Sequence, residues 1–281
     1  MRRIAVIATL REAYGFAFVH LGSIIGLIWV PMVLVTVAQF FTFHRYYNSF
    51  IDAAVTANPA LLGTSLLTML GYLAAAMLLY AIMVVAVAQL ALGARADGAI
   101  IHFSFGPLEW RTFRAFVGLT GIGMGLTFLT LTLITATNLP PLAGGGALLA
   151  VMATTFLLLG PRLILLLPAV AVSETAPVLR RAWALSQGNH LRLLAVLLGV
   201  VAPPLLVALA AEMLLGAQGP AMTSGLSMAD QVAFAKHARQ MLPLTCGLSF
   251  FVSPLVVGLF AGASVTAWRA LKDEARVEII A

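Results

Sequence analysis

Residues 61–93, LLGTSLLTMLGYLAAAMLLYAIMVVAVAQLALG, contain no charged side chain. A helix needs about 20 consecutive apolar residues to cross a hydrocarbon core about 30 Å thick. The apolar residues here follow one another instead of alternating with polar ones, as they would in a strand of an outer-membrane barrel. Because a helix is the other structure that satisfies the backbone polar groups within lipid, the stretch predicts a membrane-spanning helix.

Similar apolar blocks lie on both sides of this stretch. Of the 281 residues, 62% are hydrophobic and 9% are charged, whereas a soluble domain carries about 25% charged residues. The sequence therefore predicts a single integral membrane domain over residues 1–281, folded as an all-α polytopic helix bundle. Its six transmembrane helices are expected at about 20–43, 61–93, 115–137, 143–172, 191–213 and 243–268.

The fourth block leaves two alternatives open, because it contains Gly160-Pro161 followed by Arg162. If the span ends at Pro161, which we favour, Arg162 extends to the membrane surface, and residues 163–172 are surface or partly re-entrant chain. If the span continues to residue 172, Arg162 lies inside it, where a charge costs about 2.5–3.5 kcal/mol.

The distribution of basic residues predicts the orientation of the chain. Lysine and arginine concentrate on the cytoplasmic side of membrane proteins. With six spans and a cytoplasmic N-terminus, 13 of the 16 Lys and Arg residues fall on the inner side, and only Arg45, Lys236 and Arg239 fall outside. We therefore expect a multi-pass protein of a bacterial inner membrane with both termini cytoplasmic. The net charge of +6 then reflects topology and attraction to anionic lipid headgroups, and no basic soluble domain is present to bind nucleic acid.

Short amphipathic segments are expected to lie on the membrane surface, at about 5–18, 104–114, 176–187 and 227–240. Each of the first three precedes a hydrophobic block. The order predicts a weak threefold repeat, in which each unit is an interfacial elbow helix followed by a hairpin of two spans.

Residues 161–196, PRLILLLPAVAVSETAPVLRRAWALSQGNHLRLLAV, resemble the YciC-like proteins and the membrane domain found beside some glycerophosphodiester phosphodiesterases. Residues 21–34, LGSIIGLIWVPMVL, are similar to the first span of that family. The resemblance implies a six-span membrane fold, and catalysis in such proteins belongs to a separate soluble domain. Two positions depart from the family pattern: Ala182 replaces a common serine, and His190 replaces a common tryptophan. The features that carry the resemblance are Arg162, Pro168, Glu174, Trp183, Leu185, Gly188 and Asn189.

The sequence contains no motif that predicts catalysis, a metal site or a cofactor. The five histidines are far apart, HExxH and GxSxG are absent, and Cys246 is the only cysteine. We therefore expect a protein that is not an enzyme. The candidate site is instead one for lipid or anion, or a structural polar cluster, made of Arg162, Glu174, Arg180, Arg181, Trp183 and Asn189.

Proline and glycine give two further expectations about helix packing. Pro203-Pro204 should free the carbonyl groups around Gly199 and Val200 because proline cannot donate a backbone hydrogen bond. In a static bundle, neighbouring groups satisfy such carbonyls, whereas in a transporter the break faces a cavity. Gly121 and Gly125 form a small-xxx-small pair, which predicts close approach of another helix.

Two functions fit this sequence. The first is a non-enzymatic scaffold, assembly or accessory protein that contacts membrane lipids, especially anionic headgroups at the cytoplasmic face, and a protein partner in the membrane. The alternative is a small transporter or lipid-handling protein with a cavity near Arg162 and Pro203-Pro204. A polar cavity lined by Arg162, Gln39 or Gln89 would favour transport, and a dry, closed bundle would favour a scaffold.

Overall fold

The computed structural model describes residues 4–58, 60–94, 105–137, 141–171, 178–216 and 227–277. Over these ranges the chain is all-α and has no strand, which confirms the predicted fold class. Six of the helices are long and apolar enough to cross a membrane. The helices are α1 (Val6–Val19), α2 (Leu21–Thr56), α3 (Ala60–Leu92), α4 (Pro107–Ala136), α5 (Pro141–Ala171), α6 (Val178–Ser186), α7 (His190–Gly216) and α8 (Met228–Val277).

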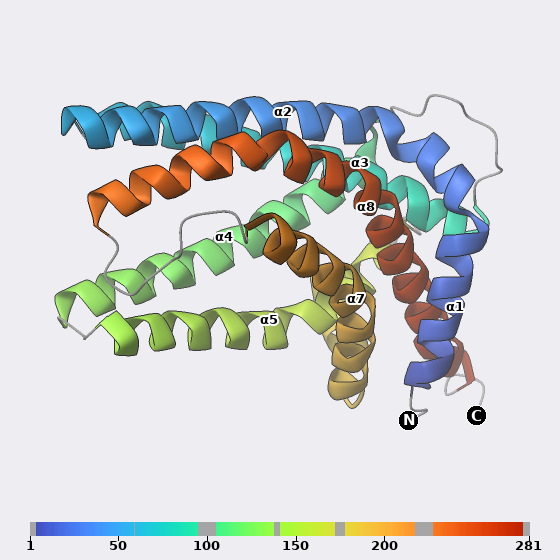
Figure 1. Cartoon of the computed structure of the whole chain (residues 1–281). Helices are drawn as coiled ribbons and strands as arrows, with labels where there is room; N and C mark the ends of the chain where they lie inside the picture. Colours follow the sequence, from blue (N-terminus) through green and yellow to red (C-terminus); the bar gives the residue numbers. More distant parts are fainter. Residues whose placement is uncertain are drawn as a thin grey trace.

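The helices form two groups that meet near α7 and the bend of α8 (Figure 1). Helices α2 and α3 and the first half of α8 run alongside one another, and α4 and α5 form a separate hairpin. Helix α8 then bends and runs beside α1, toward the end of the molecule where both termini lie.

Two hydrophobic cores hold these groups together. One core joins α2 and α3 to α8 through side chains that include Ile28, Met83 and Val257. The other core collects α1, α5, α6, α7 and the second half of α8. Ile4 and Leu271 both belong to this second core, so the two ends of the described chain pack into the same part of the bundle.

Small residues allow α1 and α8 to pack closely. A Cβ atom on Gly262 would lie 3.2 Å from the Cα atom of Ala13, and one on Gly258 would lie 3.4 Å from the Cβ atom of Ala17. Both glycines lie on the same face of α8 because they are four positions apart. This GxxxG pair therefore sets the approach of α1, as small residues do between membrane helices.

The expectation for Gly121 and Gly125 is wrong. A Cβ atom on either residue would meet nothing within 4 Å, so among the described residues no helix of the chain packs on this face of α4. The most apolar 18-residue window of α4 has none of its residues buried, although its mean hydropathy is 1.8. Glycine spacing alone does not say which face of a helix a neighbour occupies.

Several predicted boundaries differ from the helices in the structure. Helices α1 and α6 are separate short helices, as expected, but α4 is one helix over the predicted 104–114 and 115–137 segments. Its start is fixed at Gly106, whose N–H donates to Glu109 Oε2 at 2.8 Å. The 227–240 and 243–268 segments are likewise one helix, α8, and α5 does not end at Pro161. In both, a proline lies inside a continuous helix and bends it instead of ending it.

Candidate functional site

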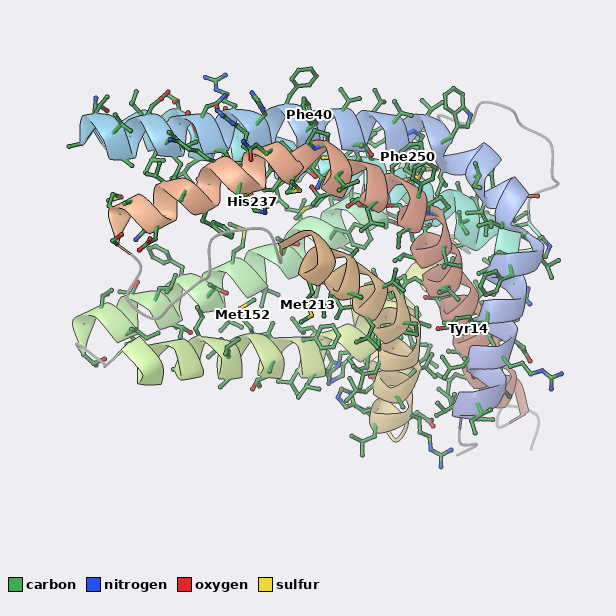
Figure 2. The ribbon with its side chains drawn as sticks, in the orientation of Figure 1. Tyr14, Phe40, Met152, Met213, His237 and Phe250 are labelled. Carbon is green, nitrogen blue, oxygen red and sulfur yellow. The ribbon has the colours of Figure 1, made fainter. Side chains whose placement is uncertain are left out.

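Pro203 in α7 leaves the carbonyl oxygen of Gly199 without a backbone donor, as its position four residues later requires. The hydroxyl of Tyr14 on α1 donates to this oxygen at 2.9 Å. Tyr14 lies where α1 runs beside α8 (Figure 2). The predicted free carbonyl is therefore confirmed at Gly199, and a neighbouring helix satisfies it. This is the arrangement expected of a static kink.

Pro161 in α5 has the same effect on the carbonyl oxygen of Leu157. Nε2 of His190, at the start of α7, lies 3.0 Å from that oxygen and can donate to it in the tautomer protonated at Nε2. The helix continues through Pro161, and the freed carbonyl of Leu157 is within hydrogen-bond distance of the His190 side chain on α7. His190 thus has a structural role at the position where the resembling family commonly has tryptophan.

The turn before α7 anchors the start of the described chain. Gly188 has a φ of +79°, a left-handed conformation that favours glycine and ends α6. Asn189, the next residue, is buried, and its Oδ1 accepts a hydrogen bond from the N–H of Ile4 at 3.2 Å. Arg192 Nη1 donates to the Ile4 carbonyl at 3.1 Å. Asn189, one of the candidate site residues, therefore binds the backbone of Ile4. Arg192, which was not among the candidate residues, binds the same backbone.

Arg162 and Trp183 meet in the structure. The central guanidinium carbon of Arg162 lies 3.3 Å from the centroid of the Trp183 ring, so the cation stacks on the indole. Stacking of this kind contributes about 0.5–2 kcal/mol, depending on how far water is excluded. Arg162 is half-buried, and its Nη1 donates to the carbonyl of Leu158 one turn earlier in α5. Its Nε is buried and has no hydrogen-bond acceptor among the described residues.

A cavity of about 590 Å³ extends from this pair along the hairpin of α4 and α5. Among the described residues of its lining, Arg162 is the only charged one. The volume lies in the range of small-molecule sites, about 300–1,000 Å³. The groove is thus apolar along its length with a cation in its wall. It is lined by Ile122, Leu126, Ala150, Val151, Thr154, Thr155, Leu158, Leu159, Arg162 and Trp183.

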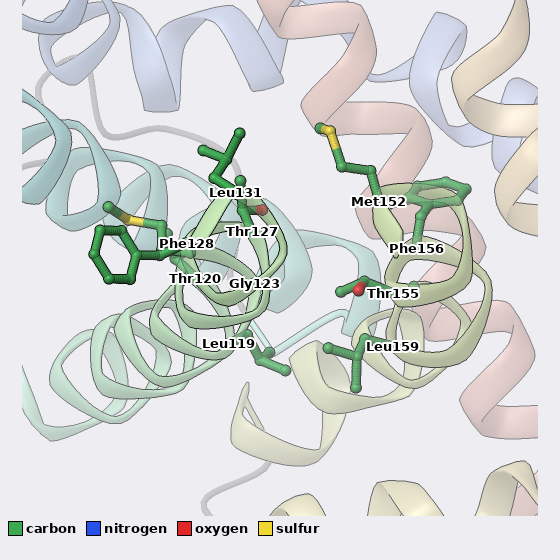
Figure 3. A pocket seen from close by; sticks show the side chains of 12 residues that line it. Leu119, Thr120, Gly123, Thr127, Phe128, Leu131, Met152, Thr155, Phe156 and Leu159 are labelled. Carbon is green, nitrogen blue, oxygen red and sulfur yellow. The ribbon is translucent and has the colours of Figure 1, made fainter. Parts of the chain in front are cut away.

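A second cavity of about 600 Å³ lies between α4 and α5 (Figure 3). Its lining includes Phe128 and Met152, and none of the described lining residues is charged. Thr155 and Leu159 line both cavities, so the two flank the same contact between the helices. The α4–α5 hairpin consequently offers apolar hollows on two sides, one of which carries Arg162.

The structure brings together only part of the predicted site. Arg162 and Trp183 form one pair, whereas Asn189 contacts the chain start instead. Glu174 and the side chains of Arg180 and Arg181 lie outside the described residues. In the described part of the chain, no three His, Cys, Asp or Glu side chains are grouped as metal ligands would be. The alternative predicted from the sequence placed a cavity near Arg162 and Pro203-Pro204. Arg162 lines one of the two cavities, and neither proline is among the residues that line them.

No protein-family model matches the chain, and comparison with curated proteins and with solved structures finds no match either. The resemblance to the YciC-like family therefore stays a prediction based on residues 161–196.

Proposed function

We propose that this chain is a lipid-handling protein of a bacterial inner membrane, in which the α4–α5 hairpin binds a lipid chain. The observation that carries the proposal is the apolar groove of about 590 Å³ with Arg162 stacked on Trp183 in its lining. A ligand that fits this cavity has an apolar chain, which contacts the apolar wall, and a charged end, which contacts the cation. A membrane lipid has both parts.

The packing of the hairpin supports this proposal. Helix α4 buries none of its most apolar window within the bundle, and large side chains on both helices are exposed, such as Phe128 at 75% and Leu149 at 70%. Such surfaces need apolar surroundings because exposed apolar area is unfavourable in water. In a membrane, lipid tails provide these surroundings and have direct access to the groove.

Transport of a polar solute has less support. That function requires a polar path, with Gln39 or Gln89 beside Arg162, yet neither glutamine lines either cavity of the hairpin. At Pro203 the freed Gly199 carbonyl is bonded to Tyr14 instead of facing a transport path. The alternative predicted from the sequence was a small transporter or a lipid-handling protein, and these observations favour lipid handling.

The proposed orientation places both termini in the cytoplasm. The 13-to-3 distribution of basic residues supports it, and so does the common core of Ile4 and Leu271, because an even number of spans returns the chain to its starting side. Arg162 then belongs to the cytoplasmic half of the membrane. Reporter fusions after residues 50 and 98 test this, with an outside and an inside readout expected in turn.

A scaffold would use the same hairpin differently, with another protein covering α4. A lipid with a photoreactive group in its acyl chain separates the two functions when it is added to membranes that contain the full chain. We expect cross-links concentrated in peptides from residues 119–131 and 150–162. Labelling spread evenly over all apolar helices, together with a stoichiometric protein partner after mild solubilisation, would contradict lipid handling and favour the scaffold.

A further inference from the structure

We infer that Arg162 is the headgroup ligand of the groove and selects a lipid with an anionic phosphate group. This inference rests on the proposed lipid-binding function and adds the chemistry of the ligand. The combined features are a half-buried arginine, an indole on one face of its guanidinium and an apolar cavity beside it.

The guanidinium has donors to offer a ligand. Arginine carries five N–H groups, and among the described residues one acceptor of Arg162 is seen, the carbonyl of Leu158. Its Nε is buried and therefore closed to a ligand, which leaves N–H groups of Nη1 and Nη2 to bind one. Stacking on Trp183 orients the guanidinium, and the planar arrangement of its N–H groups suits phosphate oxygens.

The depth of Arg162 fits a lipid phosphate. At 1.5 Å per residue, Arg162 lies about 32 Å along α5 from the first residue of the helix, Pro141. A hydrocarbon core is about 30 Å thick, so a core that begins near the start of α5 has its opposite boundary, where headgroups begin, close to Arg162. Trp183 fits the same level because tryptophan is enriched at this interface.

The groove fits an acyl chain in length as well as in polarity. Its α5 wall extends from Ala150 to Arg162, which corresponds to about 18 Å of helix. A phosphate bound at Arg162 can thus continue into an apolar chain that lies along α5. A free phosphate would fill only the charged part of this cavity, so the apolar wall favours a lipid as the source of the anion.

The test compares lipid selection between the wild type and variants of the full chain. Each protein is reconstituted in an equimolar mixture of phosphatidylglycerol and phosphatidylcholine, extracted in mild detergent, and its retained lipids are counted by mass spectrometry. The wild type should enrich phosphatidylglycerol about three- to fivefold, as expected for one partly screened charge pair. Arg162→Gln should lose the enrichment and keep the total number of bound lipids. Arg162→Lys should keep part of it, because it retains the charge but not the planar donors.

Arg114→Gln is the matched control, because Arg114 also lies near a tryptophan, 5.9 Å from the Trp110 centroid, yet lines neither cavity of the hairpin. Its enrichment should equal that of the wild type. Thermal unfolding of every variant identifies any that fail to fold. If an Arg162 variant fails to fold, Trp183→Leu is tested in its place, and it should weaken the enrichment of phosphatidylglycerol.

Three results would overturn the inference. Enrichment that survives in Arg162→Gln would show that another residue selects the charge, although the groove can still bind lipid. Loss of both lipids together in folded Arg162→Gln would show that Arg162 shapes the groove without selecting a headgroup. Displacement of phosphatidylglycerol by inorganic phosphate would identify a site for free phosphate. Failure of lipid binding in all proteins, the wild type included, would instead contradict the proposed function itself.

Discussion

The hydroxyl of Tyr14 on α1 donates a hydrogen bond of 2.9 Å to the carbonyl oxygen of Gly199, which Pro203 leaves without its helical donor. The same relationship recurs between α5 and α7. His190 lies within hydrogen-bond distance of the carbonyl oxygen of Leu157, which Pro161 leaves without its helical donor. In water a freed carbonyl would bind solvent, but within a membrane it needs a protein donor. Both bends are therefore built jointly by a proline and a polar side chain from another element.

Removing the Tyr14 hydroxyl should destabilise the protein mainly while Pro203 is present. We expect Tyr14→Phe to lower the free energy of unfolding by about 0.5–1.5 kcal/mol. In a Pro203→Ala background the cost should be smaller, because alanine has the backbone N–H that proline lacks and can donate it to the Gly199 carbonyl. Denaturant unfolding of the four proteins in detergent gives the coupling energy. Equal costs in both backgrounds would contradict the assignment.

His190 should be coupled to Pro161 in the same way. His190→Leu removes the donor to Leu157 and is expected to destabilise the fold by about 1 kcal/mol. In Pro161→Ala the backbone N–H of residue 161 can take over, so the cost of His190→Leu should fall. The same unfolding measurement checks this, with Pro203→Ala as a background that should leave the effect of His190→Leu unchanged.

The close packing of α1 on α8 should make Gly262 intolerant of larger side chains. Gly262→Leu places atoms against the backbone of Ala13, and we expect a loss of about 1–3 kcal/mol in unfolding free energy. Gly125→Leu is the matched control, because its Cβ would meet no atom within 4 Å. Gly125→Leu should be neutral or slightly stabilising, since leucine favours the helix over glycine. A similar loss at both positions would refute the packing account.

Asn189 should hold the start of the chain. Asn189→Ala removes the acceptor for the Ile4 N–H, and we expect faster amide exchange in the first turn of α1 than in the wild type. Exchange in α3 should be unchanged because that helix packs in the other core. Hydrogen–deuterium exchange with peptide mass spectrometry measures both segments in one experiment. Unchanged exchange near Ile4 would show that other contacts hold this end.

The sequence predicted the helical class, six apolar spans and the freed carbonyl at Gly199, because length, apolarity and proline chemistry are local properties. It did not predict that α8 continues through Pro243, and it left open whether α5 ends at Pro161, because a helix end depends on the neighbours that support the bend. The stacking of Arg162 on Trp183 is a tertiary contact between two helices, and composition gives no signal for it. At Gly258 and Gly262 the GxxxG spacing marks the face on which α1 packs. At Gly121 and Gly125 the same spacing predicted a close helix contact that the described residues do not make.

Two alanines of α5 test whether a lipid chain occupies the groove between α4 and α5. Ala150 lines the groove, and Ala153 is exposed on the same helix and lines neither cavity. Phenylalanine at Ala150 would take the place of about two methylene groups of a bound chain, which corresponds to an affinity about tenfold lower. The measurement is the number of lipids that co-purify with each folded variant, counted by mass spectrometry. We expect Ala150→Phe to lose bound lipid and Ala153→Phe to retain it. Equal lipid content in the two variants would show that no lipid chain occupies the groove.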